Sequence, residues 1–144
     1  MLKNVVIRKI LPKDASLVVE FVQELANHLK SPNETSLTAE QTKEHIKASM
    51  LRGSLAFVDG KPAGMMTFCV MYSTWKGPII HAEDLIVRPE FRNLKIGYKL
   101  WVDLFKFGGI NMMETEGWMR YRFERDGIER CAKLADQFNF NSKL

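Results

Sequence analysis

The sequence predicts an α/β or α+β fold, in which one mixed but mainly antiparallel sheet is flanked by helices. Three observations carry this prediction. Runs of branched apolar residues alternate with segments of helical periodicity, Asp59-Gly60 separates two apolar runs as in a β-hairpin, and 144 residues suffice for one domain. We therefore expect a single domain over residues 1–144, with the element order β-α-α-β-β-β-α-β-α and a truncated strand at the end.

The first strand and the first two helices are each marked by a sequence signal. Residues 4–10 are rich in β-branched side chains and predict a strand, which is followed at 14–30 by apolar residues at helical spacing. Thr38 and Gln41 stand three positions apart as in a capping box, so a second helix is expected to begin there. Gly53 is expected to act as the stop signal of that helix.

The rest of the chain continues the alternation of strands and helices. In chain order, we expect strands at 55–58, 63–72 and 79–87, a helix over 97–107, a strand at 118–123 and a helix over 127–138. The hairpins predict antiparallel neighbours, whereas the strand–helix–strand connections of the second half predict parallel ones.

Composition and cysteine content exclude several classes of protein. With 46% hydrophobic and 26% charged residues the chain is neither disordered nor collagen-like, and no apolar stretch approaches the length of a membrane span. Two cysteines, Cys69 and Cys131, are too few for a disulfide framework or a four-thiolate zinc site, and the three histidines lack metal-ligand spacing. We expect a cytoplasmic protein with reduced thiols and no metal.

The positive charge of the chain is concentrated in one short stretch. The net charge is +4, and four basic side chains gather around only one acid, Glu90. These cations are Arg88, Arg92, Lys95 and Lys99. Such a cluster suggests an anionic ligand, while a solvated surface loop is the simpler alternative.

Residues 83–98 predict a strand, a basic loop and the beginning of a helix. The first turn of a helix presents unpaired backbone N–H groups and the positive end of its dipole, an arrangement that binds phosphate. Gly97 allows a ligand to approach the backbone closely, and Arg92 and Lys95 add positive charge.

The spacing of this segment resembles the GCN5-related N-acetyltransferase (GNAT) family. Leu85, Val87, Pro89, Arg92 and Gly97 fall at matching positions of the family's strand and pyrophosphate loop. The resemblance implies a GNAT-like fold and an acetyl-CoA-dependent N-acetyltransferase, which moves an acetyl group to a primary amine by direct transfer in a ternary complex. It also implies that acetyl-CoA, as co-substrate, is bound by Leu85, Ile86, Val87, Arg92, Asn93, Leu94, Lys95, Ile96, Gly97 and Tyr98.

The sequence departs from the family's pattern at three places. Lys95 stands where the family prefers a glycine, so its side chain either crowds the pyrophosphate or contacts it. Ala135 occupies the position of a tyrosine that many members use to protonate the departing thiolate, which leaves Tyr98, Tyr121 or water as the donor. The chain ends four residues after Phe140, so the closing strand is expected to be short or absent.

Acetyl transfer requires the acceptor amine to lose a proton, and a carboxylate is the expected base. Glu83 is the first candidate and Asp84 the second. Strand alternation predicts that they face opposite sides of the sheet, so that only one of them points into the cleft. The resemblance implies that backbone N–H groups near Leu85 and Val87 hold the thioester carbonyl and the pantetheine arm.

Two alternatives to an active transferase stay open. One is a degenerate family member that binds acyl-CoA without turnover. The other, which ranks well behind, is a nucleic-acid-binding module that uses Arg120, Tyr121 and Arg122. The acceptor is open among polyamines, aminoglycosides, amino acids and protein lysines. We also expect a homodimer, because a short closing strand would leave one edge of the strand at 118–123 unpaired.

Overall fold

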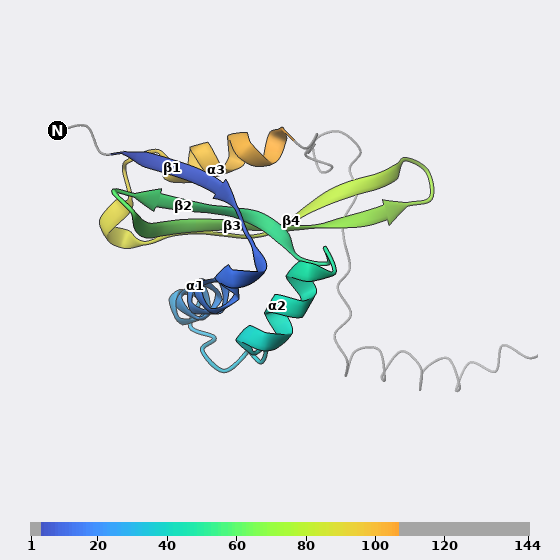
Figure 1. Cartoon of the computed structure of the whole chain (residues 1–144), viewed down its shortest axis with the longest axis horizontal. Helices are drawn as coiled ribbons and strands as arrows, with labels where there is room; N and C mark the ends of the chain where they lie inside the picture. Colours follow the sequence, from blue (N-terminus) through green and yellow to red (C-terminus); the bar gives the residue numbers. More distant parts are fainter. Residues whose placement is uncertain (1–3, 107–144) are drawn as a thin grey trace, which may run out of the picture. The chain divides into compact units, whose positions relative to one another are not determined.

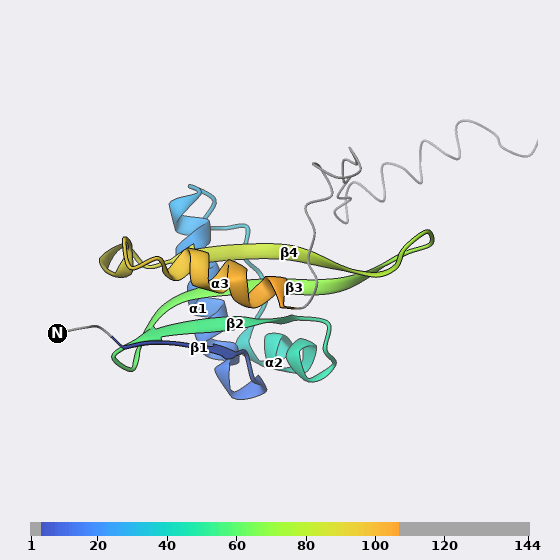
Figure 2. The ribbon, with the colours of Figure 1, turned by 90° about the horizontal axis from the view of Figure 1, so that it is seen from above.

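The computed structural model describes residues 4–106, which form one sheet with helices on both faces (Figure 1). The strand order is β1-β2-β3-β4, with every neighbouring pair antiparallel (Figure 2). The elements are β1 (Val5–Lys9), η1 (Pro12–Asp14), α1 (Ala15–His28), α2 (Ala39–Lys47), β2 (Arg52–Val58), β3 (Lys61–Ser73), β4 (Gly77–Val87), η2 (Pro89–Phe91) and α3 (Ile96–Phe105). The predicted fold class is confirmed, whereas the elements expected at 118–123 and 127–138 lie outside the described residues.

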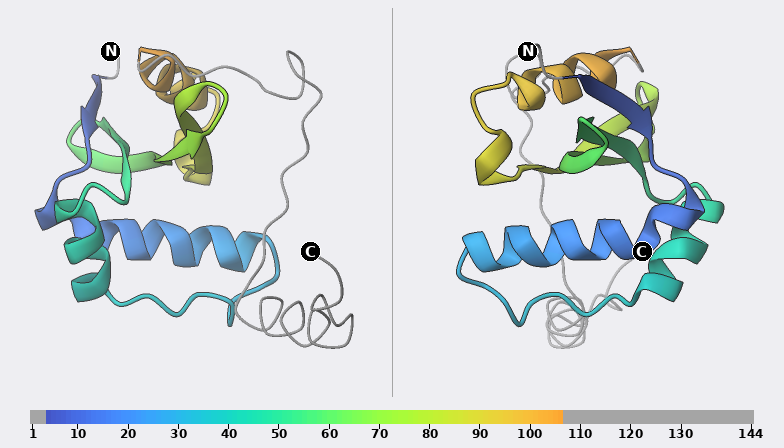
Figure 3. Two further views of the ribbon diagram at one scale, coloured as in Figure 1. Left: turned by 90° about the vertical axis from the view of Figure 1, so that its right-hand side faces the viewer. Right: turned by 60° about the vertical axis from the view of Figure 1, so that its left-hand side comes forward.

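Helices cover both faces of the sheet. α1 and α2 lie on one face and α3 lies on the other (Figure 3). One buried cluster under α1 includes Phe21, Leu55 and Ile86, and a second cluster under α3 includes Met66 and Leu100. The cluster to which a β4 residue belongs therefore tells which face of the sheet its side chain occupies.

Two local signals in the sequence are confirmed. Asp59 and Gly60 form the β2–β3 turn with φ angles of 49° and 79°, the left-handed backbone that an Asp-Gly hairpin turn uses. At the start of α2, the Gln41 N–H donates to Thr38 Oγ1 at 3.2 Å, and the Thr38 N–H donates to Gln41 Oε1 at 2.9 Å. Both features are formed by residues at most three positions apart in the sequence, so a local sequence pattern can predict them.

The predicted stop of the second helix is wrong. α2 ends at Lys47, and Ser49, with a φ of 58°, turns the chain toward β2. Gly53 is a buried residue of β2, and a Cβ atom there would lie 2.2 Å from the carbonyl oxygen of Met66. The close passage of β3 therefore requires this glycine, and helix termination does not.

A charged pair ties the start of α1 to β1. Arg8 donates to both carboxylate oxygens of Asp14, at 2.7 and 2.8 Å, and the Leu11 N–H donates to Asp14 Oδ2 at 2.8 Å. Asp14 is buried, and the hydrogen bond from Arg8 is the main reason that its pKa lies below the ordinary value. This pair belongs to the scaffold and lies on β1 and η1, away from β4.

A bulge interrupts β4. The β3–β4 register shifts between Met66 and Phe68. Across this step, Glu83 and Asp84 of β4 stand opposite the single residue Thr67 of β3, which defines a β-bulge. The regular alternation of side chains along β4 is therefore broken at the two residues that the sequence singles out as candidate bases.

Candidate active site

The bulge puts both candidate bases on one face of the sheet. Ala82 and Leu85 both belong to the cluster under α3, although they are three residues apart, so the two residues between them face the opposite side. Ile86, the next residue on that side, belongs to the cluster under α1. Glu83 and Asp84 thus share the face that α1 and α2 cover, and the expectation that alternation would separate them is wrong.

Asp84 is anchored to β3 through Thr67. The Asp84 N–H donates to Thr67 Oγ1 at 3.1 Å, and the Thr67 hydroxyl lies 3.5 Å from Asp84 Oδ2. Thr67 itself is buried, with 1% of its surface exposed. Its hydroxyl therefore supplies a partner for a backbone group of the bulge and limits the directions in which Asp84 can point.

Glu83 has a different partner, the imidazole of His81. His81 Nε2 lies 2.9 Å from Glu83 Oε2, and the two side chains are 32% and 40% exposed. The residues are two positions apart on β4, and the bulge adds its extra residue only after Glu83, so they face the same side. From the sequence, His81 was considered only as one of three histidines without metal-ligand spacing, although the i and i+2 spacing of a histidine and a carboxylate on one strand was a usable signal.

The following residues of β4 present backbone groups at the edge that faces away from β3. The Arg88 N–H donates to the Ala63 carbonyl at 2.9 Å, so Ile86 also directs its backbone groups toward β3. Because this direction alternates along a strand, the N–H groups of Leu85 and Val87 point to the opposite edge. Among residues 4–106, β4 pairs only with β3, so no described strand covers these groups.

A pocket of about 510 Å³ lies along this edge. One wall is the second half of α1, and the other is β4 with the loop that follows it. The lining residues are Glu24, Leu25, Asn27, His28, Leu85, Ile86, Val87, Pro89 and Arg92. Its volume is typical of small-molecule sites, and it joins four of the predicted ligand-binding residues in one cavity.

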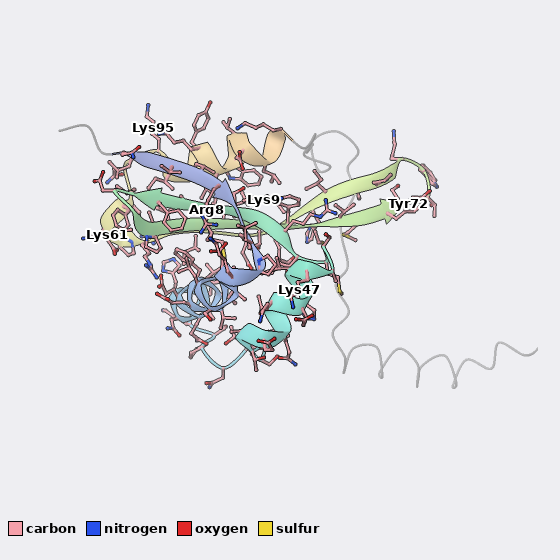
Figure 4. All side chains as sticks on the ribbon, viewed as in Figure 1. Arg8, Lys9, Lys47, Lys61, Tyr72 and Lys95 are labelled. Carbon is pink, nitrogen blue, oxygen red and sulfur yellow. The ribbon has the colours of Figure 1, made fainter. Side chains whose placement is uncertain are left out.

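The loop between β4 and α3 adopts backbone conformations that disfavour ordinary side chains. Asn93 and Lys95 have φ angles of 66° and 56°, and Lys95 directly precedes the first residue of α3 (Figure 4). This positive φ explains why the family resemblance leads to the expectation of a glycine at position 95, because glycine has no Cβ to clash in this conformation. Arg92 braces the loop through its Nε, which donates to the Val87 carbonyl at 3.1 Å.

The residues around the beginning of α3 divide into a buried and an accessible set. Ile96 is buried in the cluster under α3, which leaves only its backbone for a ligand, and Leu94 is half-buried against the same cluster, whereas Tyr98 is 70% exposed. A Cβ atom on Gly97 would have its nearest contact at 3.9 Å, from Val87. Contacts within the described chain therefore do not require a glycine at 97, and there is room beside it for a ligand.

Arg88 does not belong to the predicted anion site. Its Nε donates to both Glu24 oxygens at 3.1 Å, its Nη2 donates to Glu24 Oε1 at 2.6 Å, and it also pairs with Glu20. The guanidinium carbon lies 4.6 Å from the centre of the Phe21 ring, and the bonds from Glu24 raise the pKa of Arg88. Arg88 fastens β4 to α1, and no local pattern predicts a partner 64 residues away.

Several further predictions meet the limits of the described chain. Tyr121 and Ala135 lie outside it, and so does Cys131, while Cys69 is a half-buried free thiol. Within residues 4–106, no helix is long and apolar enough to cross a membrane. The same residues contain no group of three His, Cys, Asp or Glu side chains that could hold a metal ion.

Similarity to known proteins agrees with this geometry. Thialysine N-epsilon-acetyltransferase of Caenorhabditis elegans is 28% identical over 158 residues, covering 91% of this chain and 99% of that protein. The Sus scrofa protein of the same name is 26% identical and covers 90% and 98% of the two chains. Both relatives therefore match along nearly their whole length.

Solved structures share the fold. An aminoglycoside acetyltransferase from an uncultured soil metagenomic sample, in complex with sisomicin, superposes with a TM-score of 0.62 at 14% identity, over 97% of this chain and 90% of that one. A GCN5-related N-acetyltransferase from Ralstonia eutropha gives a TM-score of 0.62 at 11% identity, over 98% and 96%. The model of the acetyltransferase (GNAT) family matches residues 19–109, more than half of the chain. The protein therefore belongs to the GNAT family and is an N-acetyltransferase.

Proposed function

We propose that the acetyl donor is acetyl-CoA and that the acetyl group passes directly to a primary amine in a ternary complex. The observation that carries this proposal is the pocket of about 510 Å³ between α1, the outer edge of β4 and the loop before α3. Direct transfer needs both substrates held in one cavity at reacting distance. This pocket supports such an arrangement, because it extends from α1 to Arg92 in the loop.

The diphosphate of the donor is proposed to bind at residues 92–98. α3 begins at Ile96, so its first N–H groups have no partner within the helix and carry the positive end of the dipole. The room beside Gly97 and the exposed cations Arg92 and Lys95 support the same location. The donor supplies an activated acetyl group, and these residues bind and orient it.

Glu83 is the carboxylate that is proposed to assist proton removal from the acceptor, and Asp84 is the alternative. A carboxylate on the bulge assists removal of a proton from the acceptor ammonium, directly or through water, and leaves the nitrogen with a free electron pair. The N–H groups of Leu85 and Val87 would donate to the thioester oxygen as negative charge develops on it. Tyr98, or a water molecule, is proposed to protonate the departing thiolate.

The proposed acceptor is a small primary amine of the thialysine type. This proposal rests on the activity for which the relatives from Caenorhabditis elegans and Sus scrofa are named, since both match this chain along nearly its whole length. Two carboxylates on one face, Glu83 and Asp84, also suit a cationic amine. The aminoglycoside enzyme, at 14% identity, supports the fold alone.

A panel of amines tests the proposed reaction. Release of free thiol from acetyl-CoA is followed with thialysine, lysine, a polyamine and an aminoglycoside, and a reaction without amine measures hydrolysis. We expect amine-dependent thiol release, fastest with thialysine. Tight binding of acetyl-CoA with no amine-dependent release would instead favour the non-catalytic acyl-CoA-binding alternative.

We also propose a single cytoplasmic domain that forms a homodimer. The exposed apolar side chains of Val70 and Tyr72 on β3 support a contact surface, and Tyr72 lies at the end of the β3–β4 hairpin that is far from Lys95 (Figure 4). Light scattering at micromolar concentration checks the dimer. A mass near 16.6 kDa that does not change on concentration would reject it.

A further inference from the structure

His81 and Glu83 form a pair on the face of β4 that carries the candidate bases. His81 Nε2 lies 2.9 Å from Glu83 Oε2. An ionised carboxylate only accepts hydrogen bonds, so the proton of the neutral ring belongs on Nε2, and Nδ1 is the nitrogen able to take up another proton. The pair thus has the arrangement in which a carboxylate orients an imidazole base.

We propose that His81 Nδ1 receives the proton that the acceptor ammonium loses, while Glu83 orients the ring and stabilises the imidazolium. The proposal rests on the acetyl transfer proposed above and refines the role of Glu83. An N–H bond of the ammonium breaks, its electron pair stays on the amine nitrogen, and an N–H bond forms on His81, directly or through one water. The ring, 32% exposed, then returns the proton to solvent, so one proton leaves for each acetyl group transferred.

An imidazole suits this task at neutral pH better than an isolated carboxylate does. Histidine in model peptides titrates near pH 6.5 and glutamate near 4.3, and a general base is most effective when its pKa lies near the working pH. Glu83 favours the charged form of the ring. The carboxylate of Asp84, on the same face of the sheet, also favours the charged form of the His81 ring. Cys69 is the residue of β3 that stands opposite His81.

Charged groups on the neighbouring helices have partners of their own. On α1, which packs against the same face of the sheet, Glu20 and Glu24 bind Arg88. On α2, Lys47 pairs with Glu44. Among the described residues, the groups expected to govern the titration of His81 are therefore those of β3 and β4.

The first test does not depend on turnover. NMR titration of the histidine rings gives the pKa of His81 in the wild type and in Glu83→Gln, with His81→Gln to assign the signal. We expect the pKa of His81 to be lower in Glu83→Gln than in the wild type, because the charge of the partner is lost. An equal pKa in both proteins would overturn the proposal.

The second test is the pH dependence of kcat/KM with acetyl-CoA and an amine that the wild type acetylates. His81→Gln, Glu83→Gln and the double variant are compared, with His45→Gln on α2 as the matched control. We expect His81→Gln to lose roughly 10²–10⁴-fold in rate together with the acidic limb of the profile. The double variant should be no slower than the slower single variant, because the two residues act as a unit.

The outcomes separate this proposal from the proposed function. A His81→Gln variant with the wild-type profile, or losses that multiply in the double variant, would overturn the role of His81 and leave acetyl transfer standing. A wild type that acetylates none of the amines would overturn the proposed function, and the role of His81 with it. Loss of activity in His45→Gln as large as in His81→Gln would also contradict the proposal.

Discussion

The β4 bulge and the loop before α3 are only a few residues apart, yet they are built differently. At the bulge, side chains provide the partners: Glu83 pairs with His81, and the Thr67 hydroxyl accepts from the Asp84 backbone N–H and lies 3.5 Å from its carboxylate. In the loop, the backbone provides the features, namely residues with positive φ and a helix start beside Gly97. Removing a charge at constant volume should therefore damage the bulge, and adding volume should damage the loop.

The largest effect is expected at the bulge. Glu83→Gln keeps the shape of the side chain but removes its charge, so the rate at neutral pH should fall by roughly 10²–10⁴-fold while acetyl-CoA affinity stays unchanged. Steady-state kinetics and calorimetric binding measure the two quantities. Glu34→Gln, at an exposed position between α1 and α2, is the control.

The same measurements on Asp84→Asn sharpen the assignment between the two carboxylates. If Glu83 is the carboxylate on which proton transfer depends, Asp84→Asn should lose less activity, because its hydrogen bonds to Thr67 involve the backbone N–H as well as the carboxylate. A larger loss in Asp84→Asn than in Glu83→Gln would move the role to Asp84.

In the loop before α3, added side-chain volume should matter more than the loss of a charge. Gly97→Trp fills the room beside the start of α3, so CoA affinity should fall on the order of a hundredfold, or about 2.8 kcal/mol. Isothermal titration of CoA measures it. Val102→Trp adds the same side chain on the exposed surface of α3 and should bind CoA like the wild type. Equal affinities for wild type and Gly97→Trp would refute the phosphate location.

A scaffold ion pair provides a contrast with both regions. Asp14→Asn should lower the free energy of unfolding at pH 7 by about 2 kcal/mol, because Arg8 loses its buried partner. The pKa of Asp14 is lowered in the folded state, so its contribution is present above about pH 3.9 and lost as the pH falls through the folded pKa.

Urea unfolding between pH 7 and pH 2.5 checks this sign. The difference in the free energy of unfolding between wild type and Asp14→Asn should shrink below pH 4. The pH profile of the acetyltransferase activity of Asp14→Asn should keep the shape of the wild-type profile. A difference that is constant over the whole range would show that the ion pair is not its source.

The smallest effect concerns the backbone of the loop. Lys95→Gly removes a Cβ from a residue with a φ of 56°, so the protein should become more stable by about 1 kcal/mol, as measured by urea unfolding. Lys99→Gly on α3, where the backbone is helical, should instead destabilise by about 1 kcal/mol. A destabilised Lys95→Gly would mean that the lysine side chain outweighs the strain.

Features that are formed by contacts between residues close in the sequence could be predicted from it. The Asp59-Gly60 turn and the Thr38 cap depend on residues at most three positions apart. The strand, loop and helix start around Gly97 are also local, and their spacing alone indicated the family. These predictions succeed because each depends on backbone preferences that a few neighbouring residues determine.

Features set by long-range packing could not be predicted in this way. The bulge arises where β3 and β4 pair, so alternation along β4 alone placed Glu83 and Asp84 on opposite faces. Gly53 was assigned to a helix end, although its cause is the close passage of β3. Arg88 was counted in the basic cluster that suggests an anionic ligand, because its partner Glu24 is distant in sequence. Each error reflects a contact that exists only in the folded chain.

A crystal structure of Glu83→Gln with acetyl-CoA and an acceptor amine tests most directly whether the loop binds the phosphates and the bulge face binds the amine. We predict that the phosphates contact backbone N–H groups at 96–98 and that the pantetheine arm follows the edge of β4 at Leu85 and Val87. The amine nitrogen should lie within reach, directly or through one water, of His81 and position 83. Phosphates bound away from the start of α3, or an amine on the face that α3 covers, would contradict the account.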